Sequence, residues 1–369
     1  PDKLRGKEGE RIPNQRPIAE RSAERFSDDI RRFVRDYAAA IPRHAFVELV
    51  ESCMAVGLTT IVTSVIDLLF EWADTGEIRK KIDQEPAHLF VDCSNGVNRR
   101  LRKLAEQCMD DFMRRVERFP VLLVVLRLLD HGASYGPKLK KLEIATRPYA
   151  TEWLNLLGEL LHERHEEAQP ILYNLERKAS ELADGFDDEY PEAAAMLRND
   201  RSQPNAVWRI AETLTSLQGR KTMRGNVISL IDSSLLITRP NGLAMKRSVT
   251  RKHASGSGAR RRDVRSLVFT DSVLDYLVHL HVLRHGNKGG YQLLSFEKFV
   301  NILYEQYGFC IDKAPPGMMI SNDFLQEDRT VLEQRLRDLG LLVGVNDAEA
   351  MKHLRPRFEP SEEVRNDLD

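Results

Sequence analysis

Helical periodicity sustained over the first half of the chain limits the possible folds most strongly. Between residues 17 and 199, apolar residues recur at spacings of three and four, and strand signals are nearly absent. Phe26, Ile30 and Phe33, with arginine and aspartate between them, are an example. Several helices joined by short loops predict a bundle or an irregular helical array. No fixed repeat period is present, so a solenoid is not expected.

The most apolar part of this region extends from His44 to Leu69 and is interrupted by Gly57. We expect either two buried helices or one helix broken near that glycine. The longest apolar run, Val121 to Leu129, contains Arg127 and is too short to span a bilayer. We therefore expect no membrane association.

A different pattern begins near Arg201. Amphipathic helices are predicted at Asn205–Leu217 and, after a turn, at Met223–Ile231. Apolar segments at 235–238 and 243–246 then flank an Asn-Gly pair at 241–242, which is a strong local hairpin signal. Helix, turn, helix and hairpin follow one another in the order of a winged helix-turn-helix.

The same order is predicted a second time after a Ser-Gly-Ser-Gly stretch, which is typical of a mobile linker. Helices are expected at Asp271–Leu283, Ser295–Tyr307 and Asp323–Leu339, with Gly340 as the C-cap of the last one. A strand is expected to begin at Leu341, with a wing at 346–358.

This layout, over residues 201–358, resembles the tandem winged-helix proteins, and Leu332–Val343 looks like the last helix and strand of such domains. The chain as a whole also resembles uncharacterised helical subunits encoded in bacterial anti-phage defence clusters. The first resemblance implies contact with DNA or with protein, and the second implies partner subunits.

The predicted fold is therefore mainly α: an N-terminal helical bundle followed by two winged-helix-like modules with short β-hairpins. Its length of 369 residues also suggests more than one domain. The expected divisions are a flexible arm at 1–16, a helical domain at 17–200, a first winged-helix-like module at 201–247, a basic linker at 248–265 and a second module at 266–369.

A run of positive charge from Arg239 to Arg265 is the clearest functional signal. It holds nine basic residues and one acid, Asp263, for a net charge of +8, although the whole chain carries only -1. Such a cluster attracts phosphates, and its binding depends on salt because neutralised phosphates release counterions. The alternative is a solvated linker, or a segment that pairs with acids of a partner subunit.

A second basic group, at the turn before the predicted helix 223–231, lies where a helix-turn-helix approaches the DNA groove. The alternative there is a solvent-exposed turn. Together the two groups give the predicted nucleic-acid-binding residues. They are Arg220, Lys221, Arg224, Arg239, Lys246, Arg247, Arg251, Lys252, Arg260, Arg261, Arg262 and Arg265.

Catalytic and metal sites are not predicted. The chain has no phosphate-binding loop motif and no nucleophile elbow. His281 and His285 have helical spacing but no evident third ligand, so we expect them at the surface or edge of a helix. His162 and His165 are three apart, and Glu163 and Glu166 could complete a site, but an exposed helix explains these residues as well. Cys93 follows an aspartate in a turn, and no base for a nucleophile is identifiable. We expect no cofactor.

Four cysteines are scattered without a CxxC pair, which indicates a reducing compartment and favours a cytoplasmic protein. Three hypotheses remain. The first is a non-enzymatic nucleic-acid-binding subunit of a bacterial defence or genome-maintenance complex, with duplex DNA as the first candidate ligand and with protein partner subunits. The second is a structural or assembly subunit whose winged helices bind protein. The third is an enzyme of an unrecognised fold.

Overall fold

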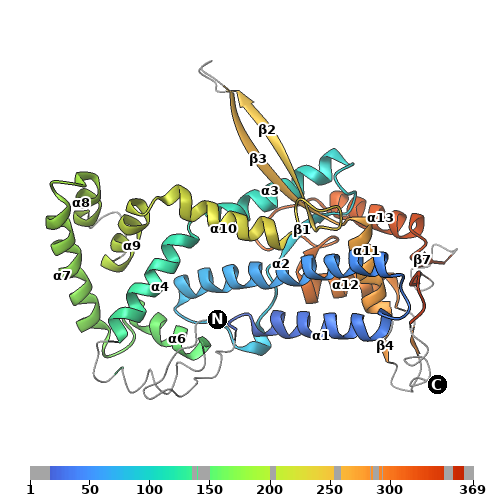
Figure 1. The fold of residues 1–369 in the computed structure, drawn as a ribbon, viewed down its shortest axis with the longest axis horizontal. Helices are drawn as coiled ribbons and strands as arrows, with labels where there is room; N and C mark the ends of the chain where they lie inside the picture. Colours follow the sequence, from blue (N-terminus) through green and yellow to red (C-terminus); the bar gives the residue numbers. More distant parts are fainter. Residues whose placement is uncertain are drawn as a thin grey trace. The chain divides into compact units, whose positions relative to one another are not determined.

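The computed structural model describes residues 17–134, 139, 150–199, 205–252, 259–282, 284–285, 291–292, 294–344 and 352–360. Helices dominate the described chain, as predicted (Figure 1). The longer helices are α1 Glu20–Tyr37, α2 Arg43–Thr75, α3 Arg99–Val116, α4 Phe119–Ala133, α6 Ala150–Leu161, α7 Ala168–Phe186, α8 Pro191–Arg198, α9 Ala206–Leu217, α10 Arg220–Ser234, α11 Asp271–Val282, α12 Phe296–Tyr307 and α13 Asn322–Asp338. A short 3-10 helix, η2, spans Lys81–Asp83.

The chain divides into two compact units, each built from segments that are distant in sequence. Unit 1 comprises residues 1–20, 65–84 and 115–229, and unit 2 comprises residues 21–64, 85–114 and 230–369. The domains expected from the sequence are continuous segments of the chain. The two units are not, because α2 and α10 each contribute residues to both.

Unit 1 is a helical bundle formed mainly by α4, α6, α7, α8 and α9. Leu122, Val125 and Leu129 of α4 are fully buried, since spacings of three and four place them on one face of the helix. The last turns of α2 belong to this unit, where Trp72 Nε1 donates a hydrogen bond of 2.7 Å to the carbonyl oxygen of Leu154. The expectation of a helical bundle is confirmed here.

Unit 2 is built around a four-stranded sheet that the sequence did not predict. Its strands are β1 Leu89–Asp92, β2 Ala244–Lys252, β3 Ala259–Val268 and β6 Phe309–Cys310, in the order β2-β3-β1-β6. β1 is parallel to both β3 and β6, and β2 is antiparallel to β3. Four two-residue strands form two further pairs: β4 Arg284–His285 with β5 Tyr291–Gln292, and β7 Leu342–Val343 with β8 His353–Leu354.

The predicted break in the helix at 44–69 is wrong, because α2 runs through Gly57 without interruption. A Cβ atom at Gly57 would overlap the ring of Phe26, so the glycine serves the close approach of α1. α2 is also long and apolar enough to cross a membrane by length and composition alone, but 61% of its most apolar window is buried inside the protein. A buried core helix meets the same criterion.

The predicted hairpin at Asn241-Gly242 is also wrong. Residues 235–242 form turns, and Leu236 has a positive φ of 47°. Asn241 is buried and ties this turn to the core, because its amide donates to Glu51 at 3.1 Å and accepts from Ser272 at 2.9 Å. The Asn-Gly pair therefore forms a packed turn rather than a strand connection.

The segment 248–265, expected as a mobile linker, instead supplies most of β2 and β3. The two strands pair over nine register positions, from Ala244 opposite Leu267 to Lys252 opposite Ala259. The glycine- and serine-rich residues between the strands, 253–258, lie outside the described residues. The basic segment is thus a β-hairpin, and its charges have fixed register positions.

The helices expected in 266–369 are present as α11, α12 and α13, and β7 pairs with β8 where a strand and wing were predicted. Residues 345–351, which include the first part of the predicted wing, lie outside the described residues. The assignment of this region to the winged-helix superfamily stays a prediction.

Candidate nucleic-acid interface

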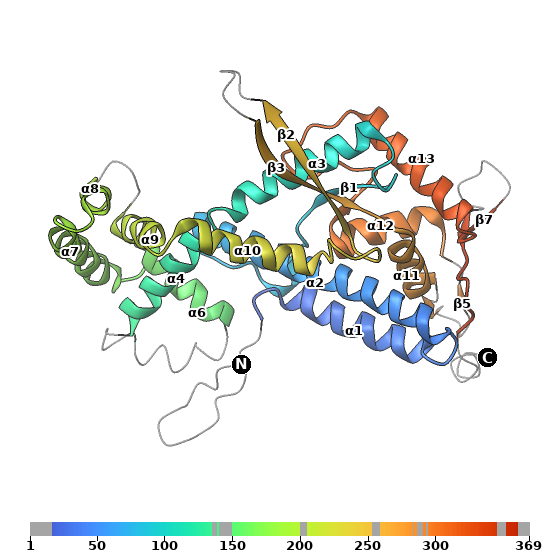
Figure 2. The same ribbon diagram turned by 45° about the horizontal axis from the view of Figure 1, so that its top comes forward.

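The basic ribbon, defined as β2 and β3, carries most of the predicted binding residues. Within the described part of the chain, only Leu267 and Val268 of β3 pair with β1, so most of the ribbon has no neighbouring strand there beyond its own two. Figures 1 and 2 both show the paired strands running away from β1, α11, α12 and α13 of the same unit. The ribbon therefore has a base beside β1 and an opposite end at Lys252 and Ala259.

Two cations at the base of the ribbon are bound by Asp232 of α10. Arg265 is buried, and its Nη2 lies 2.8 Å from Asp232 Oδ2. Lys246 Nζ lies 3.4 Å from the same carboxylate and 3.1 Å from Asp263. Because Asp232 belongs to α10, its pairs with Arg265 and Lys246 hold the ribbon to its own unit.

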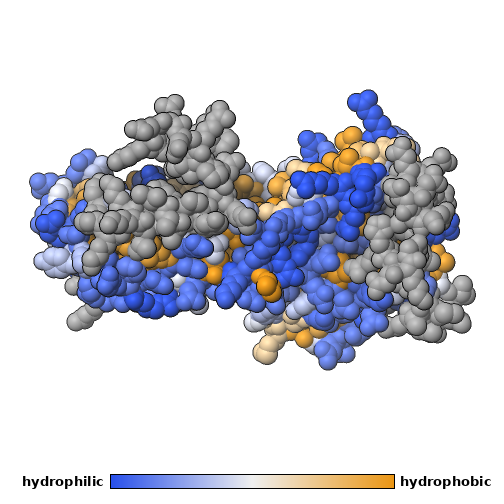
Figure 3. Space-filling view, turned by 90° about the horizontal axis from the view of Figure 1, so that it is seen from below, coloured by the Kyte–Doolittle hydropathy of each residue, from blue (hydrophilic) through white to orange (hydrophobic). Residues whose placement is uncertain are grey.

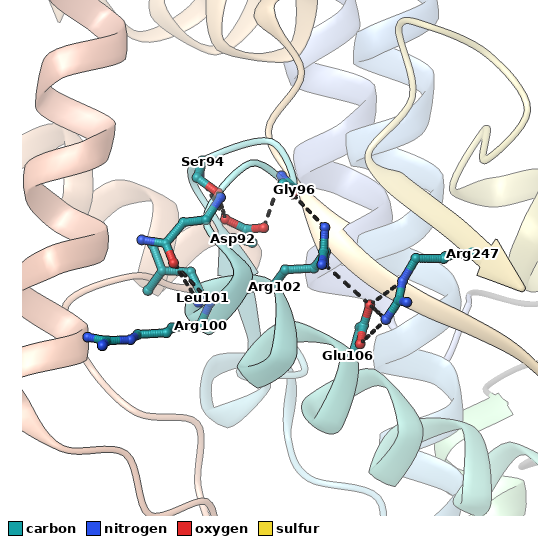
Figure 4. A network of polar contacts seen from close by, with 9 residues as sticks. Asp92, Ser94, Gly96, Arg100, Leu101, Arg102, Glu106 and Arg247 are labelled. Atoms are coloured by element: carbon teal, nitrogen blue, oxygen red, sulfur yellow. Dashed lines mark hydrogen bonds and ion pairs between the residues drawn. The ribbon is translucent and has the colours of Figure 1, made fainter. Parts of the chain in front are cut away.

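Two further cations of the ribbon bind acids of α3. Arg247 forms a two-pronged ion pair with Glu106, with N···O distances of 2.7–3.0 Å (Figure 4). Arg262 lies 3.0 Å from Asp110, one helical turn further along α3. Sequence reasoning missed the three anchoring acids, Asp232, Glu106 and Asp110, since nothing in the local sequence relates them to the basic run.

The tip of the ribbon, residues 249–252 and 259–262, contains five basic residues and no acid. Arg251 lies directly opposite Arg260, and Thr250 lies opposite Arg261. Arg261 is exposed and has no ion pair within the described part of the chain. The side chains of Arg251, Lys252 and Arg260 lie outside the described residues. Once Arg262 is set aside as anchored, four cations remain at the tip.

The second basic group lies in the first turn of α10, in unit 1. Lys221 is exposed, and Arg224 Nη2 lies 2.6 Å from Glu117. The side chain of Arg220 lies outside the described residues. This group and the ribbon belong to different units. Of the remaining predicted residues, Arg239 is exposed in the turn after α10, where it lines an apolar groove on unit 2.

A recess on α1 also gathers cations, but they have acidic or carbonyl partners. It encloses about 800 Å³ and is lined by five arginines and three acids. Arg32 lies 3.0 Å from Asp29, and Arg25 donates a hydrogen bond to the carbonyl oxygen of Gln306. Figure 3, which shows the molecule from the side on which α1 lies in Figure 1, displays a mainly hydrophilic surface there. The recess is typical of a solvated helix face crossed by ion pairs.

The turn after β1 links the centre of the sheet to the ribbon. Asp92 is fully buried and accepts hydrogen bonds from the backbone N–H groups of Ser94 and Gly96 and from the Ser94 hydroxyl, at 2.5–3.0 Å (Figure 4). Burial raises the pKa of this carboxyl although those donors oppose the shift. Arg102 donates to the Gly96 carbonyl and approaches Glu106, which binds Arg247. A continuous polar network thus connects β1, α3 and β2.

α13 covers the carboxyl ends of the parallel strands. Asp328 Oδ1 accepts the N–H of Cys93 at 2.9 Å, and Arg335 Nη1 donates to the carbonyl oxygens of Cys93 and Phe269. Arg329 lies 3.1 Å from Asp312. Burial raises the pKa of Asp328 well above its usual value, and the nearby Asp92 adds to the shift. This face of α13 therefore binds other elements of unit 2.

Cys93 and the described histidines have the burial and hydrogen bonds that are typical of residues with a structural role. Cys93 is fully buried, and burial raises the pKa of its thiol well above its usual value, so little thiolate is present. His281, expected at a helix surface or edge, is buried instead, with Nε2 at 2.9 Å from the Tyr307 hydroxyl. His162 contacts the carbonyl oxygen of Ala73. The side chain of His285 lies outside the described residues. Among the residues that the structure describes, no group of three possible metal ligands comes together.

Comparison with known proteins gives one match. The sequence model of a family described as "Methylation-associated defense system protein MAD7" matches residues 2–358. No curated protein and no solved structure matches the chain.

Proposed function

The chain belongs to this methylation-associated defense family, and on that premise we propose that it is a non-enzymatic nucleic-acid-binding subunit of its defence system. Family membership itself indicates a role in anti-phage defence alongside partner subunits. The binding activity, the absence of catalysis and a cytoplasmic location are the proposed parts. Four buried, unpaired cysteines are consistent with a reducing compartment.

The difference between the base of the ribbon, whose cations are bound by acids, and its tip, which contains no acid of its own, carries the proposal. Arg247 and Arg265, at the base, are bound by acids of α3 and α10. The tip collects Arg251, Lys252, Arg260 and Arg261 without an acid among residues 249–252 and 259–262. A cluster of cations that contains no acid attracts a polyanion, and a nucleic-acid backbone supplies phosphates at regular spacing.

The start of α10 supports the same function independently. Lys221 is exposed there, at a helix N-terminus whose N–H groups and dipole favour phosphate. Its predicted companion Arg224 is partly neutralised by Glu117. We therefore assign the ribbon tip the larger contribution and this turn a smaller one.

An assembly role is the second candidate, and an apolar groove on unit 2 favours it. The groove has a volume of about 420 Å³ and is lined by Phe46, Val47, Val50, Glu51, Met54, Leu58, Leu236 and Arg239. Val47 is 52% exposed, which leaves apolar surface of the kind that a partner helix covers. The groove and the ribbon tip share no residue, so variants can separate the two functions.

Fluorescence polarisation with labelled duplex DNA, single-stranded DNA and RNA tests the proposal. The test variant is Arg260→Gln/Arg261→Gln. The matched control, Arg177→Gln/Lys178→Gln, removes two exposed cations from α7. We expect the tip variant to bind nucleic acid about tenfold or more weakly and the control to change little. Absence of binding by the unaltered protein at low salt, or equal losses in both variants, would contradict the proposal.

A variant of the apolar groove, Met54→Lys, tests the assembly role separately from nucleic-acid binding. We expect it to retain nucleic-acid binding while losing association with proteins encoded in the same defence system. If Met54→Lys binds those proteins normally, the groove is not their docking surface.

A further inference from the structure

We propose that the basic ribbon enters the major groove of duplex DNA tip first, an inference that rests on the proposed nucleic-acid-binding function. It names both the ligand, B-form DNA, and the element that penetrates it. Four features of the ribbon and its surroundings lead to this assignment.

The first feature is the size of the element. The ribbon is a two-stranded antiparallel β-hairpin, and its strands lie about 4.8 Å apart. The major groove of B-DNA is about 12 Å wide and admits a two-stranded ribbon, whereas the minor groove is about 6 Å wide. The ribbon therefore fits the wider groove and not the narrower one.

The second feature is reach. Arg262, opposite Val249 at the start of the tip, binds Asp110 of α3 and is the described anchor nearest to the end at Lys252 and Ala259. Three register positions follow it, and at about 3.3 Å per residue they extend roughly 10 Å. That length is comparable to the depth of the major groove, about 8.5 Å. The tip can thus reach the base edges while the base of the ribbon stays fixed to its own unit.

The third feature is composition, which argues against other nucleic acids. β2 and β3 contain no phenylalanine, tyrosine or tryptophan. Proteins that bind single strands without sequence preference use aromatic side chains on which bases stack. Double-stranded RNA has a deep, narrow major groove that protein elements do not enter. A basic ribbon without aromatic residues therefore suits duplex DNA.

The fourth feature concerns α13, the other element that could enter the groove, which is already bound to the turn after β1. In a winged-helix arrangement the last helix would lie in the groove. Here Asp328 and Arg335 of α13 bind the turn after β1, and Arg337, on its exposed side, pairs with Glu333 at 2.7 Å. α13 is described throughout and offers the groove little free positive charge, whereas the sequence of the ribbon tip holds five basic residues and no acid.

The test uses the full chain and three labelled duplexes of identical sequence. One is unmodified DNA, the second carries glucosylated 5-hydroxymethylcytosine in place of cytosine, and the third is double-stranded RNA. Glucosylation fills the major groove without changing the phosphate charge. We expect the glucosylated duplex and the RNA to bind about tenfold or more weakly than unmodified DNA. Netropsin, which occupies the minor groove of A·T-rich DNA, is expected to leave the affinity for an A·T-rich duplex nearly unchanged.

Equal affinity for the glucosylated and unmodified duplexes, or displacement of the protein by netropsin, would overturn groove entry. If binding still weakens in Arg260→Gln/Arg261→Gln, the proposed function survives that result, and the tip contacts only the backbone. If no duplex binds, or if the tip variant behaves like the α7 control, the proposed function itself fails.

Discussion

Arg251 lies directly opposite Arg260 in the antiparallel register of β2 and β3. Like charges at directly opposed positions of a β-ladder destabilise the pair of strands. Neighbouring Lys252 and Arg261 add charge of the same sign. The tip is thus arranged unfavourably for the protein alone and favourably for a polyanion, which implies that its stability and its binding oppose each other.

Arg260→Glu should therefore change the two properties in opposite directions. It replaces a repulsive cross-strand pair with an attractive one, so we expect the free energy of unfolding to rise by about 0.2–1 kcal/mol. Nucleic-acid binding should weaken at the same time, because a tip cation becomes an anion. Urea denaturation and fluorescence polarisation of the same preparation check both effects. Lys178→Glu, on the exposed face of α7, is the control, and a loss of stability in Arg260→Glu would refute the interpretation of the tip.

Two of the anchoring acids, Asp232 and Glu106, should differ in importance because their arginine partners differ in exposure. Arg265 is 9% exposed, so Asp232→Ala leaves a buried cation without its carboxylate and should lower the free energy of unfolding by about 3 kcal/mol. Arg247 is 47% exposed, and water can replace Glu106, so Glu106→Ala should lower it by at most about 1 kcal/mol. Equilibrium urea denaturation measures both, and equal effects would show that the pairs are equivalent.

Asp328 predicts a pH-dependent contribution to stability. Burial raises the pKa of its carboxyl in the folded protein, whereas the unfolded chain has a pKa near about 4. The folded state therefore holds the proton more tightly, and stability is lost as the pH rises from about 4 through the folded pKa. Asp328→Asn resembles the protonated acid and does not titrate. Its stability relative to the unaltered protein should therefore increase as the pH rises from 5 to 8. A difference that stays constant with pH would contradict this assignment.

The cysteine thiols should be unreactive in the native protein. All four are buried, and burial raises the pKa of Cys53 to about 11 and raises those of Cys93, Cys108 and Cys310 as well. We expect a thiol reagent such as DTNB to label none of them rapidly under native conditions and all four after denaturation. Rapid native labelling of Cys93 would reopen the hypothesis of an enzyme with a cysteine nucleophile.

Helices with strong local signals were predictable from sequence. The expected helices at 205–217, 271–283 and 295–307 correspond to α9, α11 and α12 within one or two residues. Asn205 and Ser295 act as N-caps, with side chains that accept the backbone N–H groups of Trp208 and Lys298. These signals lie within a few residues of the elements they define, which is why periodicity and capping were sufficient.

The sheet could not be predicted in the same way. β1 has only four residues, and its parallel partners, β3 and β6, lie far away in the chain. β2 and β3 contain mostly charged and small residues, so their strand propensity is masked by a composition typical of linkers. Their pairing depends on the register between two strands and on anchoring to α3 and α10, which are tertiary features.

The candidate site was predictable as a charge cluster but not as a geometry. Counting residues identified the basic run from Arg239 to Arg265, yet only the structure shows that Arg247, Arg262 and Arg265 are bound by acids. Glu106 precedes Arg247 by 141 residues, and no pattern in one sequence links them. The distinction between anchoring cations and tip cations therefore required the fold.

The salt dependence of duplex DNA binding tests the central claim most directly. The logarithm of the binding constant falls with the logarithm of the salt concentration, with a slope of about -0.9 for each phosphate neutralised. If the tip contacts phosphates, Arg260→Gln/Arg261→Gln should reduce the magnitude of that slope by about 2 relative to the unaltered protein. The α7 control, Arg177→Gln/Lys178→Gln, should leave the slope unchanged. A slope that is the same in the tip variant and the unaltered protein would contradict the account.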